Sequence, residues 1–323
     1  MKLNSSKVFF LSFMIVGVMI CLCSNNWLFI WCGLELSLVT LLPLMRTNLI
    51  ITSESMMKYF LIQSISSGFL IIGLMLMISS LSKNNVLMTS SLLLKMGVAP
   101  FHSWLISVIE SLEIVPLLLV LTISKIAPLM ILSFIQVSLS LIIALTLMCG
   151  SFMGLTQTNV KKILTYSSIF NMGLILSVIK NNFIWLLYLT LYSILLFMLM
   201  MILWKMNSYY VNQLIHNEQL LISKFSLWIN LLSMGGMPPM LGFSIKLVVM
   251  EFLVNNKMAL NLVFIILTST LTMFFYLRIS YLILMFYCCS SKWLGSNSVK
   301  LSSFVITINF LSTPFILMFK ILI

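Results

Sequence analysis

The sequence contains no aspartate and only six glutamates, and charged side chains make up 7% of its 323 residues. A soluble domain of ordinary composition is about one-quarter charged, so this scarcity excludes a water-soluble fold. The chain is instead 61% hydrophobic, with a mean hydropathy of +1.17. Its apolar runs of about twenty residues are each long enough to cross ~30 Å of hydrocarbon as a helix. The sequence therefore predicts an all-α polytopic membrane protein.

Signatures of nucleotide, metal and nucleic-acid binding are also missing. No glycines are spaced as GxGxxG and no GxxxxGK[ST] occurs, so neither nucleotide fingerprint is present. The six cysteines include one CxC and one CC pair but no four-cysteine cluster suited to zinc or iron–sulfur. The net charge of +12 comes from single basic residues between apolar runs, which is not the basic stripe typical of nucleic-acid binding. We therefore expect no nucleic-acid partner and no metal site.

The apolar runs predict eleven spans within one membrane domain that covers residues 1–323. Span 224–254 is too long for one straight crossing, and its "GGMPP" at 235–239 is expected to break it. The segment 205–223 between two spans is expected to carry an interfacial helix. The predicted spans are 8–24, 27–45, 56–81, 86–109, 115–134, 136–155, 160–179, 183–204, 224–254, 259–288 and 301–322.

The basic residues predict the orientation of these spans. With an odd number of spans the two termini lie on opposite sides of the membrane. Ten of the eighteen basic residues fall on the side of the N-terminus, four on the other side and four inside spans. The positive-inside rule therefore places the N-terminus in the compartment where the protein is made.

Two segments of the chain resemble each other. "KMGVAPFHSWL" (95–105) and "SMGGMPPMLGF" (233–243) align as Met–Gly–x–x–Pro, which pairs Gly97 with Gly235. Each lies in an apolar span interrupted by proline and glycine, and the spacing makes the halves 8–134 and 136–288 run in opposite directions, followed by a C-terminal helix at 301–322. Paired broken helices in inverted halves are typical of a transporter whose site lies near the membrane midplane.

Ionisable residues inside the spans mark the candidate site, because a charge at mid-membrane costs about 2.5–3.5 kcal/mol. They are Glu35, Lys95, His102, Lys125 and Lys246. Burial favours the neutral form of a lysine and a nearby carboxylate favours the charged form, so such a set can pass protons. Three structural alternatives remain: a static pair of Glu35 with a lysine, snorkelling of Lys95 and Lys246 to an interface, and a packing role for His102.

Six segments of the chain together resemble a known family. They are "WCGLELSLVTLLPL", "LLLKMGVAPFHSW", "ISKIAPLMIL", "QTNVKKILTYSSI", "GGMPPMLGFSIK" and "FFYLRI". Their order and spacing resemble those of the subunit 2 family of mitochondrial NADH:ubiquinone oxidoreductase (respiratory complex I), most of all its arthropod members. The likeness covers nearly the whole chain.

This resemblance implies antiporter-like inverted five-helix repeats with two broken helices and a role in proton translocation. It makes Glu35 and Lys95 a conserved pair, Lys125 the central lysine, and Lys246 the terminal lysine of the second broken helix, while His102 matches a Pro-Phe-His motif. It also implies the mitochondrial inner membrane with the N-terminus on the matrix side, surrounded by cardiolipin-containing lipid. The partners would be other membrane-arm and accessory subunits, and other subunits would bind flavin mononucleotide, iron–sulfur clusters and ubiquinone.

One departure from the family lies in "SSIFNMG" (167–173), where Asn171 stands at a position that is commonly histidine. An amide side chain does not carry a proton, so this departure weakens the predicted path in the second half. Two other readings remain. A free-standing cation/proton antiporter would need several acidic residues for its cation, and only Glu35 lies deep in a span. A purely structural subunit would use its intramembrane charges only to hold helices together.

Overall fold

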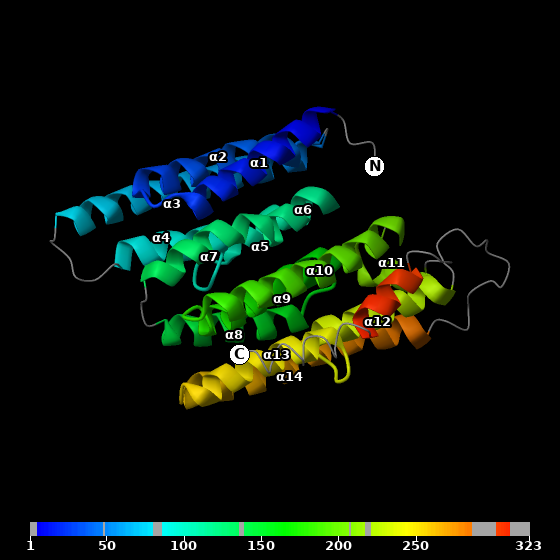
Figure 1. The fold of residues 1–323 in the computed structure, drawn as a ribbon. Coiled ribbons are helices and arrows are strands. Elements are labelled where there is room, and N and C mark those ends of the chain that lie inside the picture. Colours follow the sequence, from blue (N-terminus) through cyan, green and yellow to red (C-terminus); the bar gives the residue numbers. More distant parts are fainter. Residues whose placement is uncertain are drawn as a thin grey trace. The chain divides into compact units, whose positions relative to one another are not determined.

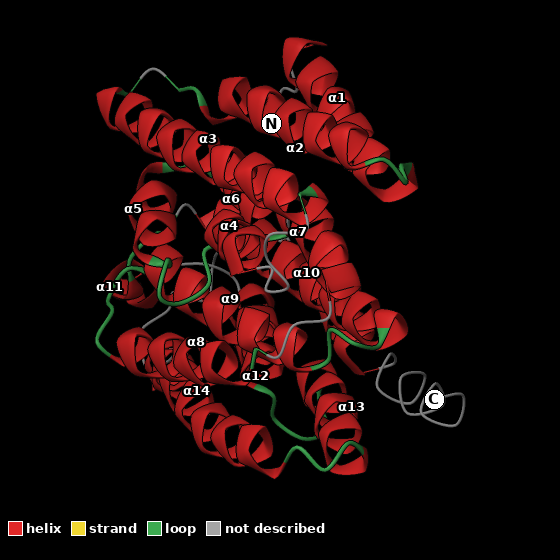
Figure 2. Cartoon of the chain, turned by 90° about the vertical axis from the view of Figure 1, so that its left-hand side faces the viewer, coloured by secondary structure: helices red, strands yellow, loops and turns green. Residues whose placement is uncertain are grey.

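The computed structural model describes residues 5–47, 49–79, 86–135, 139–206, 208–216, 221–285 and 302–310. These residues are almost entirely helical (Figures 1 and 2), and the β-structure among them is one isolated bridge between Asn159 and Tyr210. The chain divides into two compact units, Met1–Ile142 and Ile143–Ile323. The all-α prediction is therefore confirmed for the described part of the chain.

The first unit is built from helices that pack in pairs along the chain. α1 lies against α2, α3 lies against both α4 and α5, and α7 packs on α1, α4 and α6. The helices of this unit are α1 (Ser5–Cys23), α2 (Trp27–Met45), α3 (Ile50–Ile78), α4 (Val86–Met96), α5 (Ser103–Ser111), α6 (Ile114–Leu121) and α7 (Ile123–Ile135).

The second unit begins within α8 and packs its helices around α9, which is buried along nearly its whole length. α13 contacts α9, α10, α12 and α14, so it lies among most of the other helices of this unit. Residues 302–310 are also helical. The other helices are α8 (Ser140–Leu155), α9 (Val160–Ser177), α10 (Asn182–Met206), α11 (Val211–His216), α12 (Leu221–Gly235), α13 (Leu241–Asn255) and α14 (Ala259–Met285).

Six helical segments in the described ranges are long and apolar enough to cross a membrane. They are Ser5–Cys23, Trp27–Met45, Ile50–Ile78, Ile114–Ile135, Asn182–Met206 and Ala259–Leu284. Two shorter apolar helices, Val86–Met96 and Ser140–Leu155, lie at other predicted spans. The chain is thus a multi-pass membrane protein, and the count of eleven spans stays a prediction. Most of the predicted span 301–322 lies outside the described residues.

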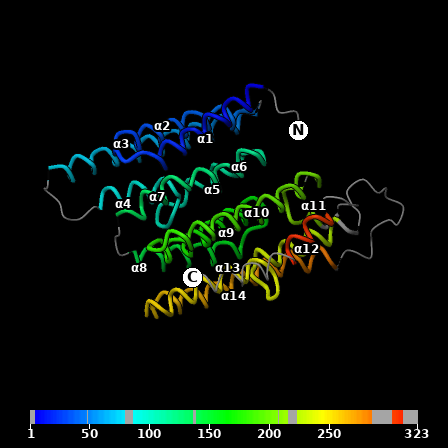
Figure 3. Tube along the Cα trace, in the orientation of Figure 1, coloured from blue at the N-terminus to red at the C-terminus, as the bar shows by residue number. Residues whose placement is uncertain are grey.

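The first predicted break interrupts the helix between α4 and α5 (Figure 3). Gly97 has a φ of 68°, which a side chain disfavours, and the Ala99–Pro100 peptide is cis. The amide of Gly97 donates to the carbonyl of Leu94 (3.2 Å) and the amide of Val98 donates to that of Leu93 (3.2 Å). These two bonds form a Schellman motif, which ends a helix on a left-handed residue.

The second break repeats this motif between α12 and α13. Gly236 has a φ of 89°, its amide donates to Ser233 (3.1 Å), and the amide of Met237 donates to Leu232 (3.1 Å). Each of these features matches its counterpart in the first break when Gly236 is paired with Gly97. The sequence alignment, which pairs Gly97 with Gly235, is therefore wrong by one position. Gly235 is the last residue of α12, and the chain turns at Gly236 instead.

A third discontinuity divides the segment that was predicted as the single span 115–134. Thr122 leaves the helical conformation (φ −122°, ψ −75°) between α6 and α7. Pro128 then lies inside α7, so the carbonyl of Ser124 loses its usual helical donor. No glycine or proline stands at Thr122 itself, which is why the sequence pattern did not show this break.

The polar segments beside the apolar runs also form helices. α3 begins at Ile50 rather than at residue 56, because the polar stretch around Glu54 and Lys58 forms a helical ion pair of 2.5 Å. The segment 205–223, where an interfacial helix was expected, carries the short helix α11.

Candidate proton-relay site

Glu35 and Lys95 come together in the first unit. Glu35 lies in the middle of α2, and Lys95 lies buried in the last turn of α4. Their charges are close enough to interact electrostatically. No ion pair within 4.0 Å joins Glu35 to Lys95 in the described ranges, and Glu35 Oε1 is buried without a hydrogen bond there. The static-pair reading is therefore not supported.

The end of α4 leaves the Lys95 ammonium available for Glu35. The indole Nε1 of Trp104 donates to the carbonyl of Leu94 (3.1 Å), and Nε2 of Gln63 donates to the carbonyl of Lys95 (3.2 Å). Neutral donors thus bond to both carbonyls at this helix end, where Leu94 also accepts from the amide of Gly97. The Lys95 side chain is not needed as a cap.

His102 lies directly before α5, just beyond the cis Ala99–Pro100 peptide. Its side chain is half-buried, and Nδ1 is buried without a hydrogen-bond partner among the described residues. A packing histidine would normally have both ring nitrogens satisfied or exposed. The unused nitrogen fits a group that exchanges a proton with water or with another side chain.

Lys125 lies on α7 of the first unit. It is 3% exposed, and its Nζ has no hydrogen-bond partner in the described part of the chain. It lies three residues after the discontinuity at Thr122, on a helix that packs against α4 and thus against the helix of Lys95. An unpaired buried ammonium is costly, so Lys125 needs either water or a neutral state.

Lys246 is held at the second break. It is buried on α13, and its Nζ donates to the carbonyl of Gly235 (2.6 Å), the last residue of α12. The ammonium also lies 5.4 Å from the centre of the Phe170 ring. A cation is stabilised at the negative end of a helix dipole and over an aromatic face. Lys246 therefore does not snorkel to an interface.

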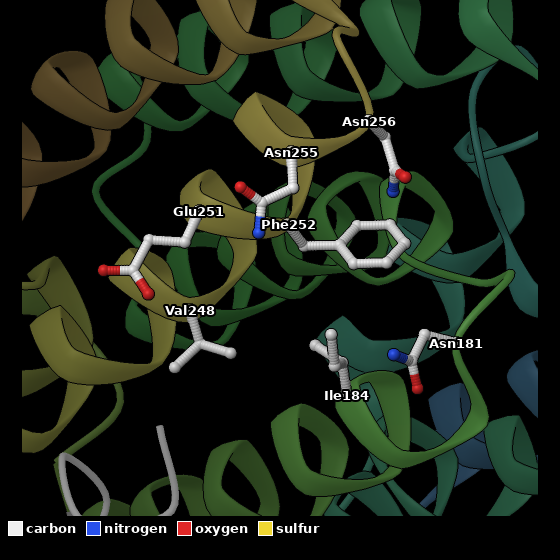
Figure 4. Close-up of a pocket in the computed structure, with 7 residues that line it drawn as sticks. All are labelled: Asn181, Ile184, Val248, Glu251, Phe252, Asn255 and Asn256. Atoms are coloured by element: carbon white, nitrogen blue, oxygen red, sulfur yellow. The ribbon is translucent and has the colours of Figure 1, made fainter. Parts of the chain in front are cut away.

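Two cavities lie in the second unit. One, of about 220 Å³, borders Lys246 and is also lined by Ser269 and Thr270 of α14. The other, of about 410 Å³, has Glu251 and Asn255 of α13 on one side and Asn181 and Ile184 on the other (Figure 4). In the described ranges no group of three His, Cys, Asp or Glu residues lies close enough to hold a metal ion.

Several polar groups buried in the second unit were not predicted from the sequence. The hydroxyl of Tyr188 donates to Asn171 Oδ1 (2.8 Å), while the buried hydroxyls of Tyr192 and Tyr276 have no partner in the described part of the chain. Leaving a buried polar group unsatisfied costs about 1–3 kcal/mol. The spacing of four between Tyr188 and Tyr192, and between Ser167 and Asn171, could have placed each pair on one helix face.

Arg278 has a structural role. Its guanidinium donates to the carbonyls of Leu155 (2.7 Å) and Gln157 (3.0 Å) at the end of α8. A cation at this end of a helix satisfies orphan carbonyls and complements the helix dipole. Arg278 is therefore a cap of α8 rather than a relay group.

Comparison with known proteins covers nearly the whole chain. The family model described as "NADH:quinone oxidoreductase/Mrp antiporter, TM" matches residues 24–272. NADH-ubiquinone oxidoreductase chain 2 of Anopheles gambiae is 37% identical over 97% of this chain and 96% of its own length. That of Locusta migratoria is 35% identical over 96% of this chain and 94% of its own length. The chain belongs to the NADH-ubiquinone oxidoreductase chain 2 family. The resemblance seen in the sequence is thereby confirmed.

Solved structures share the fold of this chain 2 family member. A chain of respiratory complex I from Thermus thermophilus with bound aureothin matches with a TM-score of 0.78 at 19% identity, covering 96% of this chain and 80% of that one. A chain of the Mrp complex from Dietzia sp. DQ12-45-1b matches with a TM-score of 0.70 at 16% identity, covering 84% and 59% respectively. At these identities the likeness shows the fold, which both assemblies share.

Replacing Glu35 with glutamine tests whether the charge of Glu35 acts on Lys95 in this chain. The variant keeps the size of the side chain and removes the charge that interacts with Lys95. We expect normal assembly and less proton translocation per NADH oxidised, measured in vesicles containing the purified complex. Glu54→Gln, which changes an exposed pair with Lys58, is the control. Equal pumping by Glu35→Gln and the control would contradict a role for Glu35.

Proposed function

We propose that this chain is a proton-translocating membrane-arm subunit of respiratory complex I and holds no redox centre itself. The observation that carries the proposal is the family relationship over nearly the entire chain. As a core subunit it acts within NADH:ubiquinone reductase, while flavin mononucleotide, iron–sulfur clusters and ubiquinone are bound by other subunits. Its partners are the antiporter-like and small core subunits of the membrane arm, together with accessory subunits.

The proposed relay consists of Glu35, Lys95, His102, Lys125 and Lys246. Its support is that the three lysines are buried and that neither Glu35 nor Lys125 is fixed in an ion pair within the described ranges. Moving one elementary charge against the field costs about 2.3 kcal/mol per 100 mV, so the lysines must alternate between charged and neutral states. The redox reaction elsewhere in the complex drives this alternation.

We also propose eleven spans in one membrane domain, with inverted halves near 8–134 and 136–288. The repeated Schellman motif, with a left-handed glycine at the same place in each break, supports a duplication of the broken helix. The proposed location is the mitochondrial inner membrane, in lipid that includes cardiolipin. The N-terminus lies on the matrix side, as the excess of lysine and arginine on that side favours.

A free-standing cation/proton antiporter is the second candidate, because the Mrp complex shares the fold. Acidic residues weigh against it, since Glu35 is the carboxylate placed in the middle of a described apolar helix. The curated relatives that are 37% and 35% identical carry the name of a respiratory subunit instead.

A native gel separates the two candidates. We expect this chain, identified by mass spectrometry after gentle solubilisation of native membranes, to migrate with the very large band that oxidises NADH. A chain that migrates only as a small species away from that band would refute the complex I assignment and favour the antiporter.

A further inference from the structure

The second unit contains a buried polar cluster that the proposed relay does not use. It is formed by Ser167 and Asn171 on α9, Tyr188 and Tyr192 on α10, and Tyr276 on α14. The three tyrosine side chains are all buried. The cluster draws its members from three different helices, so it exists only in the folded unit.

The cluster is incompletely hydrogen-bonded. Tyr188 is satisfied by Asn171, but the hydroxyls of Tyr192 and Tyr276 form no hydrogen bond in the described part of the chain. Tyr192 interacts with Asn171 and Ser167, and Tyr276 interacts with Ser167, without the geometry of a hydrogen bond, so both hydroxyls lie around the same serine. A buried water is held by two to four polar partners, and this cluster supplies them.

The cluster borders the end of α12, which holds Lys246. A Cβ on Gly235 would stand 3.4 Å from Cβ of Tyr276, and Lys246 donates to the carbonyl of that same glycine. Asn181 and Asn255 line the 410 Å³ cavity. Counted along the helices, Tyr192 lies about 15 Å from Asn182 and Lys246 about 14 Å from Asn255, so both lie at a similar distance from the helix ends beside this cavity.

Tyr188 lies between this cavity and the deeper tyrosines. It follows Ile184, which lines the cavity, by one helical turn, and precedes Tyr192 by another. Long helical side chains lean toward the N-terminal end of their helix, so the ring of Tyr188 leans toward the cavity. Tyr188 and Tyr192 therefore place a hydroxyl on each of the next two turns of α10 beyond the cavity.

We propose that Tyr192 and Tyr276, bridged by a buried water held with Ser167, relay protons to and from Lys246 in place of a titrating side chain at Asn171. A hydroxyl accepts a proton on its oxygen as its own proton passes to the next oxygen, so it ends neutral and the chain of bonds is reversed. An amide does not do this, and Asn171 instead positions Tyr188. This inference rests on the proposed proton translocation.

The water is tested on the unmodified complex. A density map of the intact complex, fine enough to show ordered water, is expected to contain a water within about 3 Å of the hydroxyls of Tyr192 and Tyr276. If such a map contains no water at these two hydroxyls, the inference is overturned, whatever result the variants give.

The relay is tested by the double variant Tyr192→Phe with Tyr276→Phe, which removes two hydroxyls and keeps both rings. We expect assembled complex whose protons translocated per NADH oxidised fall to the level of Lys246→Met. The matched control is Tyr281→Phe, an exposed tyrosine on the same helix as Tyr276. Full pumping by the double variant, with Lys246→Met impaired, would overturn the relay alone. Full pumping by Lys246→Met as well would refute the proposed function.

Discussion

Replacing Lys125 with methionine is expected to impair proton translocation while the complex still assembles. Methionine has an unbranched apolar side chain one heavy atom shorter than that of lysine, and it holds no proton. Bringing an unsupported charge to mid-membrane costs about 2.5–3.5 kcal/mol, so we expect transfer through this subunit to slow by more than about tenfold. The measurement is the number of protons translocated per NADH oxidised in vesicles containing the purified complex.

If Lys125 served only to hold helices together, the same variant would lose stability and fail to assemble. Lys125 has no hydrogen-bond partner in the described part of the chain, so the substitution breaks no contact there and removes a buried polar group. We therefore expect resistance to heating, followed on native gels, to stay equal or increase. Lys180→Met, at an exposed position, is the control. Full pumping by Lys125→Met would refute its role, and loss of assembly would indicate a structural one.

Replacing Gly242 with alanine is expected to prevent stable assembly of the subunit. A Cβ at this position would overlap the carbonyl oxygen of Ser233, which belongs to the backbone of α12. Backbone moves less readily than a side chain, so α12 and α13 would have to separate at the second break. We expect a loss of at least about 3 kcal/mol of stability and little of this chain in the large NADH-oxidising band.

Gly68→Ala is the matched control for this substitution. Gly68 also lies within a helix, α3, but a Cβ there would meet nothing within 4 Å. Alanine is favoured over glycine in a helix by about 1 kcal/mol, so this variant should assemble as well as the unmodified chain. Similar assembly of both variants would show that the close approach of α12 and α13 is not required.

The family, the membrane class and the place of two helix breaks followed from the sequence because each rests on local chemistry. Apolar runs, glycine and proline act on the residues around them, and the breaks predicted within 95–105 and at 235–239 are present. The exact match between the breaks did not follow, because Gly235 and Gly236 both fit Gly–x–x–Pro and the preceding Met234 favoured Gly235. Only the backbone conformation shows that Gly236 is the counterpart of Gly97.

The sequence by itself determined which ionisable residues are placed in apolar helices, since that depends only on their neighbours along the chain. The tertiary structure decided which of them meet: Glu35 acts on Lys95 from another helix, whereas Lys125 has no partner among the described residues. It also placed Tyr192 of α10 and Tyr276 of α14, which are far apart in the chain, near the same serine. Contacts between distant residues depend on how helices pack, and packing is a property of all the side chains at an interface together.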